Sequence, residues 1–175
     1  AYDQVIHDVC MQSLPVVFCL DRAGIVGEDG ETHQGVFDLS YLRAVPNIVL
    51  MAPKDESDLR HMLLTALEHN GPIALRYPRG KGMGVSIKDR PVPIAIGKAV
   101  VEEEGRDAAI FAVGPLVYTG LLARERLLSK GISVAVVDCR FIKPLDAELL
   151  CQIAARVKLV VTLEENVLSG GFGSG

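Results

Sequence analysis

The sequence predicts an α/β fold built from two successive three-layer units, each with a parallel sheet at its centre. Short apolar runs alternate with longer stretches in which apolar residues recur at helical spacing. This alternation stops in a segment rich in Gly, Pro and charge at 81–95, and then begins again. The chain has 175 residues, of which 49% are hydrophobic, so it is long enough to bury a substantial core. We therefore expect one domain at 1–80, a linker at 81–95 and a second domain at 96–175.

The first unit is expected to contain an N-terminal helix and then three strands that alternate with two helices. The helix should end near residue 12, and the later elements are expected at 14–20, 37–43, 47–51, 55–69 and 73–77. Strands separated by helices in this way form a right-handed parallel sheet, in which the first strand should be buried. The helix at 55–69 is expected to present one apolar face, made of Leu59, Met62, Leu63 and Leu67.

The second unit repeats the alternation after the linker. We expect an edge strand at 96–102, further strands at 108–113, 133–138 and 159–163, and helices at 116–129 and 147–157. Gly131 stands where a glycine commonly ends a helix, and Asp146 is placed to cap the next helix. The stretch 138–146 between them is interpreted as a structured connection.

Composition excludes several classes of partner. The net charge is −4, and acidic and basic residues are mixed along the chain, so no nucleic acid partner is expected. No apolar run approaches the roughly 18 residues of a membrane span, so no membrane partner is expected either. The four cysteines lie far apart, without the spacing of a metal site or of a disulfide framework, and favour a reducing compartment.

A loop at 21–35 combines charged side chains with four glycines directly after the first strand. Open α/β sheets bind ligands at the carboxyl ends of their strands. Arg22 begins this loop and Arg79 follows the strand at 73–77, so a parallel sheet would place both side chains at the same edge. Two guanidinium groups there suit a phosphate monoester, and surface ion pairs with nearby acids are the alternative. Arg76, inside the strand, is interpreted as structural.

His33 and Asp29 are the candidate catalytic residues of the same loop. An imidazole titrates near neutral pH, so His33 could exchange a proton or bind a carboxylate, with a purely structural histidine as the alternative. Asp29 could orient a substrate hydroxyl or the imidazole, although Asp-Gly is also a common turn pair. Glu164 and Glu165 precede the glycine-rich segment 170–175, whose backbone N–H groups could meet an anion, unless the segment has an interface or structural role.

The decisive motifs are Asp-Arg-Ala-Gly at 21–24, Gly-Glu-Asp-Gly at 27–30, Thr-His-Gln-Gly at 32–35 and Arg-Tyr-Pro-Arg-Gly at 76–80. Together they resemble the 1-deoxy-D-xylulose-5-phosphate synthase family. The similarity continues, in order, through 37–43, 51–53, 140–146, 164–166 and 170–173. The wider transketolase-like group shares the Gly-Glu-Asp-Gly-x-Thr-His-Gln core, whereas the segments around Arg22 and Arg79 favour the synthase.

The resemblance implies a transketolase-type fold, with 1–80 as part of a pyrimidine-binding domain and 96–175 as part of a C-terminal transketolase-like domain. It implies a homodimeric transferase that condenses pyruvate with D-glyceraldehyde 3-phosphate to 1-deoxy-D-xylulose 5-phosphate and releases CO₂. This product serves isoprenoid precursor, thiamine and pyridoxal biosynthesis. The implied cofactors are thiamine diphosphate and Mg²⁺, and the implied compartment is the bacterial cytoplasm, or the plastid stroma in a plant.

By position in the motifs, the resemblance implies that Arg22 and Arg79 bind the acceptor's phosphate and that Asp29 contacts its hydroxyl end. It places His33 near the cofactor-bound pyruvate, where it would bind the carboxylate or assist proton transfer to the new alcohol. No residue of this chain is assigned to the cofactor or to a metal, because the family's main ligands for both are expected upstream of residue 1. The sequence is thus interpreted as an internal fragment that is inactive on its own.

Two other interpretations stay open at this point. A transketolase, or the β subunit of a 2-oxoacid dehydrogenase, uses a similar pair of domains, although Arg22 argues against both. Alternatively, the two α/β units form a noncatalytic assembly module in which the loop residues are structural.

Overall fold

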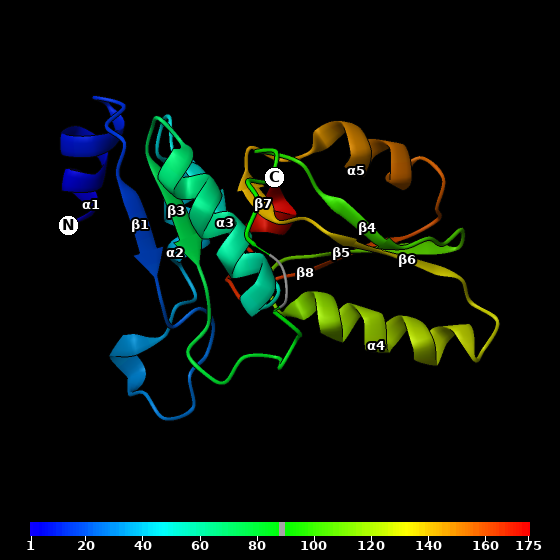
Figure 1. The fold of residues 1–175 in the computed structure, drawn as a ribbon. Helices are drawn as coiled ribbons and strands as arrows, with labels where there is room; N and C mark the ends of the chain where they lie inside the picture. The colour runs from blue at the N-terminus through cyan, green and yellow to red at the C-terminus, as the bar shows by residue number, and fades with distance from the viewer. Residues whose placement is uncertain (88–89) are drawn as a thin grey trace.

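The computed structural model describes residues 1–87 and 90–175, which form two adjoining α/β units (Figure 1). Positions 88 and 89 of the expected linker lie outside the described residues. In Figure 1 the first sheet runs beside α3, and the second sheet lies between α4 and α5. The expected architecture of two layered α/β units is therefore confirmed.

The first unit has the expected order of elements. It begins with α1 at Tyr2–Gln4, which continues as a π-helical turn at Val5–Cys10. Its strands are β1 at Val17–Leu20, β2 at Val49–Met51 and β3 at Ile73–Arg76, and its other helices are α2 at Asp38–Ala44 and α3 at Glu56–Glu68. Both β1 and β2 pair in parallel with β3, so the predicted parallel arrangement is present with β3 in the middle.

The second unit also follows the prediction. Its elements are β4 at Val100–Glu103, β5 at Ala108–Ala112, α4 at Leu116–Leu128, β6 at Val134–Asp138, α5 at Ala147–Ala154, β8 at Val160–Leu163 and a 3₁₀ turn at Phe172–Ser174. The strand order is β4-β6-β5-β8, in which β6, β5 and β8 are parallel and β4 is an antiparallel edge strand. Gly131 has φ +78° after α4, and the Asp146 carboxylate accepts from Leu149 N at the start of α5.

The stretch 138–146 is more than a connection, because it contains the additional strand β7 at Phe141–Lys143. This strand lies antiparallel to β2 and completes the first sheet in the order β1-β3-β2-β7. Three residues are too few to show a strand period, and the partner strand lies about 90 residues earlier in the chain, so the pairing left no local signal. Each sheet thus has three parallel strands and one antiparallel strand. The division at 1–80 and 96–175 stays a proposal, since the later part completes the sheet of the earlier part.

Burial was predicted wrongly for β1, Leu63 and Leu67. The strand β1 lies at the edge of its sheet, so Cys19 is exposed. On α3, Met62 is fully buried, whereas Leu63 and Leu67 are 40% and 69% exposed. The buried face of α3 instead includes the polar residue Thr65, whose hydroxyl accepts from Ile94 N in the linker. The linker therefore contacts α3 at Thr65, which apolar periodicity had not placed on the buried face.

The largest hydrophobic core is shared by both units. It contains Leu39 and Leu50 from the first unit and Phe111, Val137 and Ile142 from the later part of the chain. Because β7 inserts into the first sheet, Ile142 is only 1% exposed. Burial of this common core therefore couples the stability of the two units.

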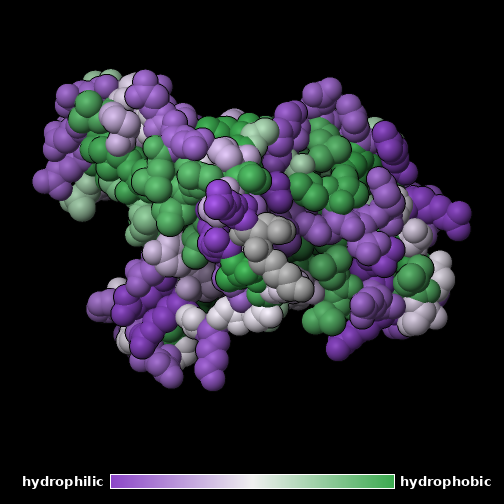
Figure 2. All heavy atoms as spheres, viewed as in Figure 1, coloured by the Kyte–Doolittle hydropathy of each residue, from purple (hydrophilic) through white to green (hydrophobic). Residues whose placement is uncertain are grey.

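The surface is mixed in character (Figure 2). Hydrophilic side chains gather over the lobe formed by the 21–35 loop at the lower left, and hydrophobic side chains lie over the first sheet above it. Across residues 1–87 and 90–175, no helix combines the length and the apolar character needed to cross a bilayer.

We expect the shared core to make unfolding a single cooperative transition. The substitution Ile142→Ala should lower the free energy of unfolding by about 2–5 kcal/mol and move the whole transition, because it creates a cavity between the units. Urea titrations followed by far-ultraviolet circular dichroism would measure this. The matched control is Ile132→Ala, because Ile132 is 38% exposed and should matter little. Two separated transitions in the unsubstituted protein would contradict a shared core.

Candidate functional site

The parallel sheet determines where the 21–35 loop lies. The last residues of β1 and β3 are register partners, so the segments that follow these strands leave the sheet at the same edge. Ala23 N then donates to the carbonyl of Tyr77 at 3.1 Å, which continues the pairing beyond the strands. Arg22 and Arg79 are therefore brought to the same edge, as the parallel pattern predicted.

The two guanidinium groups converge on the carboxylate of Asp29. Arg22 Nε donates to Oδ2 at 2.8 Å, and Arg79 Nη1 donates to Oδ1 at 2.5 Å. Arg22 Nη1 also lies 3.0 Å from Asp21, and Arg79 Nη2 lies 3.5 Å from Glu28. The ion pairs considered as an alternative are thus formed, and they hold both arginines in one cluster.

The guanidinium groups of Arg22 and Arg79 are exposed enough to contact an anion in addition to the Asp29 carboxylate. The side chain of Asp29 is only 11% exposed, whereas those of Arg22 and Arg79 are 39% and 43% exposed. A guanidinium carries five N–H donors, of which Arg22 uses two for Asp29 and Asp21, and Arg79 uses two for Asp29 and Glu28. Asp21 and Glu28 are 59% and 86% exposed, so solvent screens their charges. Arg22 and Arg79 therefore keep N–H donors that are accessible from the solvent.

The side chain of Gln34 fixes the shape of the loop. Its Oε1 accepts from Val26 N at 2.6 Å, and its Nε2 donates to the carbonyls of Val26 and Gly30 at 3.2 Å and 3.1 Å. Nε2 also lies 3.3 Å from the carbonyl of Asp29. Sequence reasoning missed this role, because only the folded loop brings these carbonyls around one amide.

Two glycines close the base of the loop. Gly24 N donates to Gly35 O at 2.8 Å, and Gly35 N donates to Gly24 O at 2.9 Å. A Cβ at position 35 would lie 2.2 Å from the carbonyl oxygen of Arg22, so a side chain there is excluded. Arg22 has φ +60° and Gly24 has φ +76°, so the chain turns sharply on leaving β1.

His33 lies on the surface of the loop. It ends a 3₁₀ turn at Glu31–His33 and is exposed, with Nδ1 2.9 Å from Thr32 Oγ1. The histidine is thus not part of a packed core. Its imidazole can meet a ligand that approaches the sheet edge.

Arg76 is structural, as its place inside the strand predicted. It is 4% exposed, and its Nε donates to Asp38 Oδ2 at 2.9 Å. Its Nη2 donates to the carbonyls of Gly35 at 2.7 Å and Glu165 at 2.5 Å. One buried guanidinium thereby joins β3, the start of α2, the base of the loop and the segment that follows β8.

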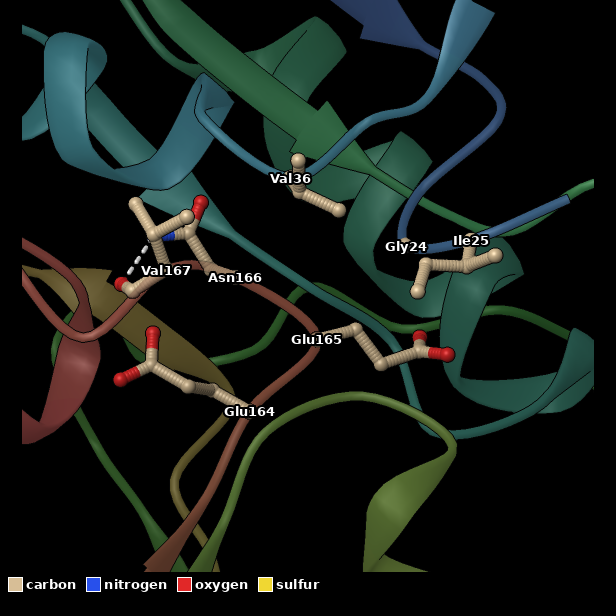
Figure 3. A pocket seen from close by; sticks show the side chains of 7 residues that line it. All are labelled: Gly24, Ile25, Val36, Glu164, Glu165, Asn166 and Val167. Atoms are coloured by element: carbon tan, nitrogen blue, oxygen red, sulfur yellow. Dashed lines mark hydrogen bonds between the residues drawn. The ribbon is translucent and has the colours of Figure 1, made fainter. Parts of the chain in front are cut away.

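A pocket of about 480 Å³ lies between the loop and the segment that follows β8 (Figure 3). It is lined by Gly24, Ile25, Val36, Glu164, Glu165, Asn166 and Val167. Figure 3 shows the side chain of Glu165 extending toward Gly24 and Ile25. Burial raises the pKa of Glu165; the nearby Arg76 opposes this shift and Asp38 adds to it.

Backbone N–H groups of the glycine-rich segment at 170–175 bind a carboxylate of the chain itself. The carboxylate of Glu164 accepts from Phe172 N at 2.7 Å and from Gly173 N at 2.9 Å. The side chain of Arg43 donates to the carbonyls of Gly170 and Gly171, which ties the segment to α2. These contacts support the structural alternative for Glu164 and the glycines.

The fit of this chain to thiamine diphosphate is limited. Within residues 1–87 and 90–175, no three His, Cys, Asp or Glu side chains cluster in a way that could hold a metal ion. The pocket beside the loop presents Glu164 and Glu165, and two carboxylates repel a diphosphate. The described residues therefore do not fit the diphosphate end of this cofactor.

Comparison with known proteins gives two family matches. The family described as "Transketolase, pyrimidine binding domain" matches residues 1–84, and the family described as "Transketolase, C-terminal domain" matches residues 97–175. A solved structure described as "Split gene transketolase, inactive beta4 tetramer" superposes with a TM-score of 0.88 at 32% identity, covering 99% of this chain and 56% of that one. The fold and both matches define a transketolase-type chain.

Curated relatives narrow this class. The chain is 59% identical to the 1-deoxy-D-xylulose-5-phosphate synthase of Desulforudis audaxviator (strain MP104C) and 58% identical to 1-deoxy-D-xylulose-5-phosphate synthase 1 of Geobacter sulfurreducens (strain ATCC 51573 / DSM 12127 / PCA). Each match covers 99% of this chain and 27% of the relative's length. The chain therefore carries segments of two transketolase domain families and is similar to 1-deoxy-D-xylulose-5-phosphate synthases, of whose matched members it spans about a quarter.

We expect Arg76→Met to lower the free energy of unfolding by about 3–5 kcal/mol, because it leaves the buried carboxylate of Asp38 without its cation. The double substitution Arg76→Met with Asp38→Asn should recover part of this loss, since the amide can be buried uncharged. Urea unfolding of both variants measures the difference. A double variant no more stable than Arg76→Met would show that the pairing with Asp38 is not the source of the loss.

Proposed function

We propose that this chain supplies the acceptor-binding part of a thiamine diphosphate-dependent synthase. The reaction would condense pyruvate with D-glyceraldehyde 3-phosphate to 1-deoxy-D-xylulose 5-phosphate with release of CO₂. The convergence of Arg22 and Arg79 on one shielded carboxylate carries this proposal, because it leaves guanidinium donors facing the solvent at a ligand-binding edge. The names of the relatives support the same reaction.

Each side chain of the loop has a distinct proposed role. Arg22 and Arg79 bind the phosphate of the acceptor through their remaining N–H donors. Asp29 sets the spacing of the two guanidinium groups and meets the hydroxyl end of the acceptor. His33, exposed on the same loop, binds the carboxylate of pyruvate or delivers a proton to the oxygen that becomes the new alcohol.

The same-fold alternatives, a transketolase or the β subunit of a 2-oxoacid dehydrogenase, are less well supported. Transketolase-type domains alone would fit all three proteins. Arg22 favours the synthase, and the two curated relatives described above carry that name at 58–59% identity. A noncatalytic assembly module would not need two partly exposed arginines that converge on one carboxylate.

The described residues supply only part of the proposed active site. The main ligands for thiamine diphosphate and Mg²⁺ would come from the remainder of the synthase, so the 175 residues alone should be inactive. We further propose a homodimer in the bacterial cytoplasm, in keeping with the bacterial sources of the relatives. Light scattering of the full-length protein would distinguish this homodimer from a tetramer, the state that the name of the solved relative describes.

We expect Arg22→Ala in the full-length protein to raise KM for D-glyceraldehyde 3-phosphate far more than KM for pyruvate. Loss of a charge-assisted hydrogen bond costs about 1.5–3 kcal/mol, which corresponds to roughly 10- to 150-fold in affinity for the phosphorylated acceptor. Steady-state kinetics with each substrate varied in turn would measure this, with the exposed Arg126→Ala as the matched control. Equal changes in both KM values would remove Arg22 from the phosphate site.

We expect His33→Ala to act chiefly on kcat, lowering it by about 10²-fold or more, since a positioned proton donor is lost. KM for the acceptor should change little, because the arginines still bind the phosphate. The exposed His7→Ala is the matched control. A variant with unchanged kcat would assign His33 a structural role only.

A further inference from the structure

Gly24, at the base of the loop, is covered by a side chain from the second unit. Its backbone has φ +76°, a region that favours glycine. A Cβ built on Gly24 would lie 2.8 Å from both Cδ and Oε1 of Glu165, so that side chain rests directly on the glycine. Figure 3 shows the same approach of Glu165 to the Gly24–Ile25 backbone. The absence of a side chain at position 24 thus makes room for Glu165.

The backbone that carries Glu165 is firmly attached to the first unit. The carbonyl of Glu165 accepts from Arg76 Nη2, and Val167 N donates to Val36 O at 2.9 Å. Next to it, Asn166 Nδ2 donates to Ser40 Oγ at 2.8 Å. These contacts lie at residue 165 and at the two residues that follow it, and they fix this backbone against the end of the loop and the start of α2. The side chain therefore has a fixed origin from which to reach Gly24.

The position of Gly24 determines where Arg22 points. Gly24 lies two residues after Arg22 and is paired with Gly35 by two backbone hydrogen bonds. If Gly24 shifts, the strained turn at Arg22 and its Nε contact with Asp29 must shift with it. A displacement of about 1 Å in a positioning group can cost on the order of 10²-fold in rate or affinity.

We propose that Glu165 is a positioning residue for the acceptor site: by packing against Gly24, it holds the turn that aims Arg22 at the acceptor's phosphate. This inference deepens the proposed function and rests on it. It also gives the second unit a definite role in acceptor binding, although Glu165 itself does not contact the acceptor. The titratable groups around the Glu165 carboxyl, Arg76 and Asp38, are paired with each other, so the contact works by packing rather than by a change of charge.

The test compares Glu165→Ala with Glu165→Gln in the full-length protein. Glu165→Ala should raise KM for D-glyceraldehyde 3-phosphate by roughly tenfold and leave KM for pyruvate unchanged, because only the acceptor arginine is released. Glu165→Gln keeps the shape of the side chain and should restore a KM near that of the unsubstituted protein. Glu148→Ala, an exposed glutamate of α5, is the matched control and should change neither constant. Equal shifts in both KM values, or a glutamine variant as impaired as the alanine variant, would overturn the proposal.

A measurement that does not need turnover separates this inference from the proposed function. Amide hydrogen exchange of peptides covering 21–35 should be faster in Glu165→Ala than in Glu148→Ala, because the Gly24–Gly35 pair loses its cover. Unchanged exchange in this loop would overturn the contact as a positioning device. If exchange accelerates but the unsubstituted protein never uses D-glyceraldehyde 3-phosphate, the proposed function fails while the control of the loop by Glu165 stands.

Discussion

The buried guanidinium of Arg76 is the interaction on which the arrangement of the site depends. At 4% exposure it is neutralised by Asp38, and its other donors reach the carbonyls of Gly35 and Glu165. A buried cation without these partners would be strongly unfavourable. The segments that supply the partners must therefore pack around Arg76. The end of the loop, the start of α2 and the segment after β8 are therefore held together at the carboxyl edge of β3.

At this sheet edge, the structural arginine and the two arginines of the proposed binding site differ in how deeply they are buried. Arg76 lies inside the strand, and its donors go to Asp38 and to backbone carbonyls of the chain. Arg22 and Arg79 lie beyond the strand ends, share Asp29 and remain about two-fifths exposed. Three arginines near one sheet edge thus divide into one that builds the site and two that remain able to bind an anion.

Much of this could be predicted from the sequence because it depends on local pattern and strand direction. Alternating strands and helices predicted the parallel sheets, and parallel sheets predicted that Arg22 and Arg79 would meet. The strand β7 could not be predicted, since its pairing with β2 is decided by contacts about 90 residues apart. The hydrogen bonds of Gln34 and the packing of Glu165 on Gly24 likewise exist only once the loop and the second unit are in place.

The central claim is that Arg22 and Arg79 together recognise the phosphate of the acceptor. The most direct measurement is the ratio of kcat/KM for D-glyceraldehyde 3-phosphate to that for unphosphorylated D-glyceraldehyde, in the full-length protein and in the variant that carries both Arg22→Ala and Arg79→Ala. Phosphate recognition predicts that this ratio collapses in the double variant while kcat/KM for D-glyceraldehyde stays nearly constant. A ratio that survives, with both substrates impaired equally, would contradict the account.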